Sequence, residues 1–130
     1  AHVVCWGEFE YVPVTPTVRR SVCASQGCAS LSGTEVLAQK GDCISEAALL
    51  VPWLHRGWLD ATMSSELLTV GRERLVGVVH NHPEMLKIME SYSRALLEAM
   101  EREDPDALSD MELPASHSAL LVAMPLEDRI

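Results

Sequence analysis

Apolar residues recur at three- and four-residue steps in the second half of the chain, which is the clearest helical signal in the sequence. Between residues 84 and 103, six of them share one helical face: Met85, Ile88, Met89, Tyr92, Leu96 and Met100. Pro83 suits the first turn of such a helix, and the Asp104-Pro105 pair ends it. The pattern predicts a long amphipathic helix on an outer face of the fold.

Shorter apolar runs predict strands. Residues 3–14 mix β-branched and aromatic side chains in partial alternation, which is typical of one or two strands. Residues 74–79 and 117–124 are short, continuous apolar runs, and each predicts a buried strand. Residues 19–34 are rich in small and polar types and predict a loop, with a short helix beginning near Thr34.

A buried helix is predicted to begin at Gly41-Asp42-Cys43, because Asp42 can cap it and the residues from Ile44 to Leu54 are mostly apolar. Pro52 bends that helix or begins a second one. Together these elements predict a single domain over residues 1–130. Its class is α+β or α/β, with the buried helix packed on a small, mostly antiparallel sheet.

Composition and charge narrow the range of functions. The chain has 130 residues, 48% hydrophobic and 22% charged, which is typical of one folded domain. Its net charge of −9 repels phosphate backbones, so we expect no nucleic-acid partner. No apolar run approaches the length of a membrane helix and no leader peptide is evident, so we expect a cytoplasmic protein without a membrane partner. The initial Ala1 suggests a processed or excised chain.

The four cysteines, at positions 5, 23, 28 and 43, all lie in the first third of the chain. An even count permits two disulfides, but a chain with this much apolar material does not need them, so reduced thiols are expected. A four-cysteine zinc site is a weaker interpretation, since Cys23 and Cys28 are spaced more widely than a usual zinc knuckle.

Cys43 is the candidate nucleophile. At the first turn of a helix, the unpaired N–H groups and the helix dipole would lower its pKa and favour the thiolate. His117, at the start of a predicted strand, is the candidate base. Asp128, or Glu127 beside it, could orient the imidazole. The backbone N–H of Cys43, with Gln39 as a second donor, would hold the oxyanion.

The run from Ser32 to Val51 resembles the nucleophile region of the transglutaminase-like cysteine hydrolases, which have a V-L pair, a G-[DV]-C turn and a helix with A-x-L-L-V. The stretch from His117 to Val122 is similar to the strand that begins with the catalytic histidine of that family. The resemblance implies a papain-like arrangement and a thiol hydrolase or acyltransferase that acts on peptide or amide bonds of a peptide or protein substrate. It implies no cofactor. Viral papain-like leader proteases are similar, which adds self-processing as a possibility.

Two other functions stay open. His80-Asn81-His82-Pro83 resembles the H-x-H-P signature of the zinc-dependent isopeptidases of the JAB/MPN type. On a strand, His80 and His82 would point to one side and could share a zinc ion, although no third ligand is evident nearby and Asn81 as a helix cap is a simpler account.

A non-catalytic interaction domain is the third hypothesis. Met85, Met89 and Met100 form a methionine-rich stripe, and with Trp53 and Trp58 they could bind a partner protein.

Overall fold

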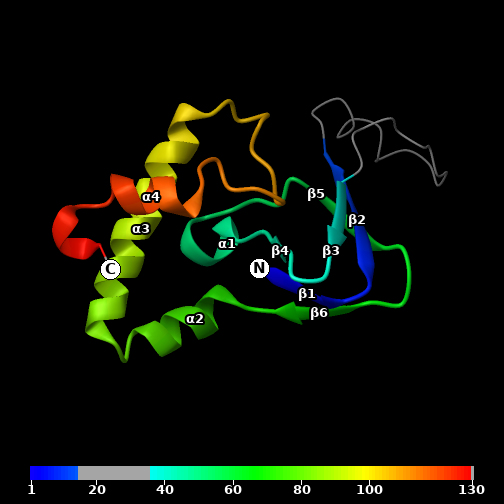
Figure 1. Cartoon of the computed structure of the whole chain (residues 1–130), viewed down its shortest axis with the longest axis horizontal. Coiled ribbons are helices and arrows are strands. Elements are labelled where there is room, and N and C mark those ends of the chain that lie inside the picture. The colour runs from blue at the N-terminus through cyan, green and yellow to red at the C-terminus, as the bar shows by residue number, and fades with distance from the viewer. Residues whose placement is uncertain (15–35, 130) are drawn as a thin grey trace.

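The computed structural model describes residues 1–14 and 36–129, so the predicted loop at 19–34 lies outside the described part. Helices occupy one side of the molecule and two small sheets the other (Figure 1). The α+β class with small antiparallel sheets is therefore confirmed, whereas the papain-like arrangement is not. No helix in the described segments is long and apolar enough to cross a membrane.

The first sheet has the order β4-β1-β6, with β1 (His2–Trp6) antiparallel to both β4 (Cys43–Ile44) and β6 (Glu66–Thr69). The second has the order β3-β2-β5, with β2 (Glu8–Pro13) antiparallel to both β3 (Val36–Gln39) and β5 (Gly57–Ala61). The prediction of one or two strands at 3–14 is thus confirmed, and the segment forms two, β1 and β2.

Gly7 makes the turn between β1 and β2. Its φ of +89° is a conformation that glycine adopts without strain. A Cβ at this position would also lie 2.1 Å from the Ser65 hydroxyl oxygen. The chain can therefore pass from one sheet to the next here only with a residue that has no side chain.

The helical side contains α1 (Ala47–Leu50), α2 (Arg72–Val79), α3 (Pro83–Arg102), α4 (His117–Ala123) and a short 3₁₀ turn, η2 (Leu126–Asp128). The predicted amphipathic helix is confirmed as α3, with Pro83 in its first turn. One buried cluster joins α1, α3 and α4: Ala47, Val51, Ala95, Leu96, Leu120 and Met124. A second lies between the sheets: Val4, Phe9, Ala38 and Ile44.

Two predicted strands are helices. The run 74–79 belongs to α2, and the run 117–124 forms α4. Ser116 caps α4, because its side-chain oxygen accepts a hydrogen bond from the Ala119 N–H. Leu120 and Met124, four residues apart, are both buried, which is the period of a helix. Runs this short do not distinguish helix from strand by themselves. The short helix predicted from Thr34 is also wrong where it is described, because Val36–Gln39 forms β3.

The helix predicted to begin at Cys43 does not begin there, because Cys43 lies in strand β4 and pairs with Val3 of β1. The Asp42 carboxylate accepts a hydrogen bond from the Gln39 N–H at 2.8 Å, so it closes the β3–β4 turn and caps no helix. The helix α1 is only four residues long. It ends before Pro52, as expected from the extended backbone that a proline imposes on the preceding Val51.

Candidate functional site

Cys43 lies in a strand and not at a helix start, so the predicted source of thiol activation is absent. Burial raises the pKa of its thiol, and the carboxylate of Glu46 raises it further. A raised pKa leaves less thiolate at neutral pH. The expectation of a lowered pKa is therefore wrong. Gln39, the predicted second oxyanion donor, directs its side-chain amide to the Glu8 carboxylate at 3.4 Å.

His117 and Asp128 contact different residues and not each other. The His117 Nδ1 atom is 2.6 Å from the Tyr92 hydroxyl oxygen, and its Nε2 atom is 3.7 Å from Glu46 Oε2. Asp128 accepts a hydrogen bond from the Ser91 hydroxyl and forms an ion pair with Lys87 at 2.6 Å. The hydrogen bond and charge of Lys87 hold the pKa of Asp128 below its ordinary value.

The hydrogen bonds and ion pairs of the described residues connect none of Cys43, His117 and Asp128 to another of the three. Cys5 and Cys43 are free thiols, and Cys23 and Cys28 lie outside the described residues.

The two histidines of the predicted zinc motif occupy the connection between two helices. His80 follows the last residue of α2 and His82 precedes the first residue of α3, and both are exposed. The strand geometry that would point them to one side does not exist here. In the described residues, no three His, Cys, Asp or Glu side chains are arranged to bind a metal ion. Asn81 does not cap the start of α3, where His82 is the N-cap residue; its side-chain amide donates to the carbonyl of Gly77 in the last turn of α2.

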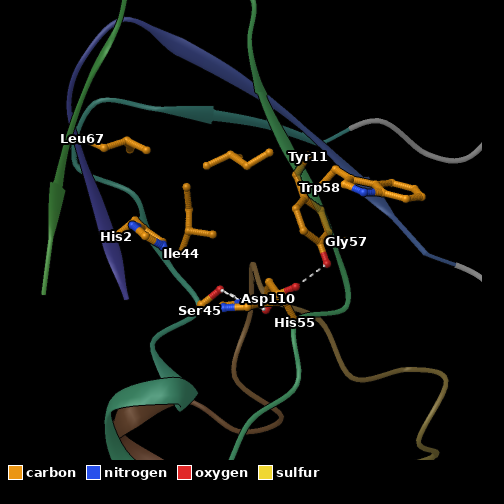
Figure 2. Close-up of a pocket in the computed structure, with 10 residues that line it drawn as sticks. His2, Tyr11, Ile44, Ser45, His55, Gly57, Trp58, Leu67 and Asp110 are labelled. Carbon is orange, nitrogen blue, oxygen red and sulfur yellow. Dashed lines mark hydrogen bonds and ion pairs between the residues drawn. The ribbon is translucent and has the colours of Figure 1, made fainter. Parts of the chain in front are cut away.

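A buried carboxylate that the sequence did not reveal lies between the helices and the sheets. Asp110 is 4% exposed. It accepts hydrogen bonds from Trp53 Nε1 at 2.6 Å, the Arg56 N–H at 2.5 Å, Ser45 Oγ at 2.9 Å and the Tyr11 hydroxyl at 2.9 Å. Figure 2 shows Ser45, His55 and Asp110 close together below the ring of Tyr11.

The protonation states at Asp110 follow from these donors. Burial alone would raise the pKa of Asp110, but the hydrogen bonds outweigh it and the pKa lies below its ordinary value. Burial and the hydrogen bond from its hydroxyl to Asp110 raise the pKa of Tyr11 to about 12. The site therefore holds an ionised carboxylate and a neutral phenol, and Asp110 is a weak base.

Ser45 and His55 also meet Asp110. The His55 Nδ1 atom is 3.1 Å from Ser45 Oγ and 3.2 Å from Asp110 Oδ1. Ser45 has a φ of +57° in the turn between β4 and α1, and its backbone N–H donates to the Asp110 carbonyl at 2.6 Å. A charge-relay triad needs the histidine to bridge serine and aspartate through its two different nitrogens. Here Ser45 and Asp110 both contact Nδ1 of His55, so the three residues do not form such a triad. Their contacts hold the three chain segments together.

A pocket of about 290 Å³ adjoins Asp110. Its lining comes from both sheets and from the segment after α1: His2, Tyr11, Ile44, Ser45, His55, Gly57, Trp58, Leu59, Leu67 and Asp110 (Figure 2). Tyr11, Ser45 and His55 on its wall contact Asp110. His2 contacts Thr69, which is outside the pocket lining.

A larger apolar groove, of about 450 Å³, lies between α1, α2, α3 and α4. Eight apolar side chains line it: Leu49, Leu50, Leu75, Val79, Met85, Ile88, Met89 and Leu121. Three polar side chains complete the lining: Glu46, Tyr92 and His117. The helix α2 has no buried residue, and its two groove residues, Leu75 and Val79, are partly exposed.

The predicted methionine stripe forms part of this groove through Met85 and Met89, whereas Met100 packs against the helical core. The two tryptophans lie elsewhere. Trp53 donates to Asp110, and Trp58 lines the pocket between the sheets. The stripe on α3 was thus a usable signal for one wall of the groove. The walls from α2 and α4 were missed because those segments were expected to be strands.

Comparison of the chain with protein-family models, with curated proteins and with solved structures finds no match.

Proposed function

We propose that this domain is a protein-interaction module that binds an amphipathic helix of a partner protein in the groove between α1, α2, α3 and α4. The observation that carries the proposal is a solvent-open groove of about 450 Å³ with eight apolar side chains on its walls. Exposed apolar surface gains roughly 25 cal/mol for each Å² removed from water, so a continuous patch of this kind favours a bound partner.

The walls of the groove favour a helix over an extended peptide. All four surrounding elements are helices, whose backbone hydrogen bonds run along the helix and not toward a neighbouring strand. They offer no free row of N–H and C=O groups for a peptide that adds as a strand. A helix satisfies its own backbone and needs only apolar contact, which leucine, isoleucine and two flexible methionines provide.

Peptide binding to matched variants tests the proposal. The probe is a fluorescein-labelled amphipathic helix with leucines on one face and lysines on the other, titrated by fluorescence polarisation. Leu121, in the groove, is 36% exposed, and its neighbour Val122, which is not among the groove residues, is 67% exposed. We expect Leu121→Ser and Met85→Ser to weaken binding roughly tenfold, and Val122→Ser to change it less than about twofold.

Circular dichroism of each variant checks that the fold is kept. Binding that does not saturate, or that Val122→Ser weakens as much as Leu121→Ser, overturns the proposal. All three substitutions are uncharged, so a difference between them reports apolar contact and not attraction to the lysines.

The thiol hydrolase expected from the sequence is the alternative proposal, because Cys43 and His117 share Glu46 as a neighbour. In that reaction the Cys43 thiolate attacks an amide carbonyl and His117 passes a proton to the leaving amine. The raised pKa of Cys43 works against it. A zinc-dependent hydrolase using His80 and His82 would be indicated by stoichiometric zinc in the purified protein.

A further inference from the structure

Glu46 is the acidic residue of the groove lining, and the described residues that line the groove include no lysine or arginine. Its side chain is 29% exposed, so the carboxylate is already partly withdrawn from water in a largely apolar wall. Among the described residues, the side chain in ion-pair range of Glu46 is His117, at 3.7 Å, and this histidine carries a charge only when it is protonated.

While His117 is neutral, its contacts leave the charge of Glu46 poorly compensated. A neutral imidazole that accepts from the Tyr92 hydroxyl at Nδ1 carries its hydrogen on Nε2, which faces Glu46. At 3.7 Å this is longer than a hydrogen bond. The negative charge of Glu46 also acts on two neighbouring groups, because it contributes to the raised pKa values of Cys43 and Tyr92.

A partner helix that covers the groove removes more water from Glu46. A carboxylate that loses water without gaining a cation or a hydrogen bond costs binding energy. An acidic side chain placed beside it adds repulsion, whereas a lysine or arginine supplies the missing counter-charge. The groove therefore discriminates among helices that have the same apolar face.

We infer that Glu46 selects, among amphipathic helices of other proteins, those that carry a lysine or arginine at the edge of the apolar face. This inference rests on the proposed function of the groove. A second copy of the chain is a poorer occupant, because each copy has a net charge of −9.

A peptide series with fixed leucines tests the selection. One edge position of the labelled helix is occupied by lysine, glutamine or glutamate in turn, and this position is moved around both edges of the apolar face. For the register that faces Glu46, we expect the wild-type protein to bind the lysine peptide roughly five- to tenfold more tightly than the glutamine peptide, and the glutamate peptide most weakly.

The variant Glu46→Gln should reduce the lysine preference to less than about twofold, and added salt should reduce it in the wild type. Glu84→Gln is the matched control, because Glu84 is exposed at the start of α3, is not a groove residue, and its substitution removes the same charge. The control should retain the preference.

The outcomes separate the two proposals. If every peptide binds wild type equally and Leu121→Ser still weakens binding, Glu46 has no selective role and the groove function stands. If Glu84→Gln removes the preference as Glu46→Gln does, general charge and not Glu46 is responsible. If no peptide binds in the groove, the proposed function itself fails.

Discussion

Asp110 connects the chain segment between α3 and α4 to β2 and to the segments on both sides of α1. Its donors come from β2, from the turn before α1 and from the segment after it, and Tyr11 is 99 positions away along the chain. A buried carboxylate with four or more donors stabilises one arrangement of these segments, because removing it leaves several buried donors unpaired.

The substitution Asp110→Asn is expected to lower the free energy of unfolding by about 3 kcal/mol, since an amide places its own N–H groups against existing donors. Urea denaturation followed by circular dichroism measures the change. Asp106→Asn, at an exposed position nearby, should change stability by less than about 0.5 kcal/mol. A loss of under about 1 kcal/mol at Asp110 would show that the carboxylate is not an anchor.

The pH dependence of stability provides a second test of the same residue. The folded-state pKa of Asp110 lies below the ordinary value of an aspartate, so the folded protein binds this proton less tightly than the unfolded chain does. Its contribution is complete above the unfolded pKa and is lost as pH falls through the folded pKa. The stability difference between wild type and Asp110→Asn should therefore be constant near neutral pH and shrink below about pH 4.

Cys43 should react slowly with iodoacetamide at pH 7, because burial and Glu46 raise its pKa. Cys5 is exposed and should be alkylated faster, as mapped by mass spectrometry. Glu46→Gln should speed the reaction at Cys43 modestly. Fast alkylation of Cys43 alone below pH 7, abolished by His117→Ala, would instead favour the thiol hydrolase.

At the scale of elements, periodicity was informative where it was long. The α3 pattern repeats over twenty residues, which predicts the helix. The β1 and β2 segments combine alternation with aromatic residues, which predicts strands. The α2 and α4 segments are eight and seven residues long, which is too short for periodicity to separate helix from strand. Packing of Leu120 and Met124 against α3 decides the latter.

The site shows the same limit. The methionines on α3 could be found from their spacing, but Ser45, His55 and Asp110 stand in unrelated segments. Only the tertiary fold brings them together, and no local pattern encodes a contact between residues that are 55 to 65 positions apart.

Two adjacent leucines test how α3 is oriented. Leu96 is fully buried in the helical cluster, and Leu97 is 41% exposed. Leu96→Ala should lower the free energy of unfolding by about 3 kcal/mol through lost contacts and a cavity, and Leu97→Ala by less than about 1 kcal/mol. Equal losses in urea denaturation would mean that α3 presents a different face to the core.

At the scale of the whole molecule, the two candidate sites have different characters. The pocket beside Asp110 lies between the sheets, and three of its lining residues, Tyr11, Ser45 and His55, contact Asp110, so it belongs to the part that maintains the fold. The groove lies among the helices and exposes apolar side chains with one poorly compensated carboxylate. Substitutions at Asp110 are therefore expected to change the stability of the fold, and substitutions in the groove to change partner binding.

The most direct test of the groove function is methyl NMR of the protein with labelled methionines, during titration with the leucine–lysine helix. Met85 and Met89 line the groove, whereas Met63 is 52% exposed in the connection between β5 and β6. The account predicts saturable shifts of the Met85 and Met89 methyl resonances and none at Met63. Equal shifts at Met63, or no shift at Met85 and Met89 with peptide in excess, would contradict it.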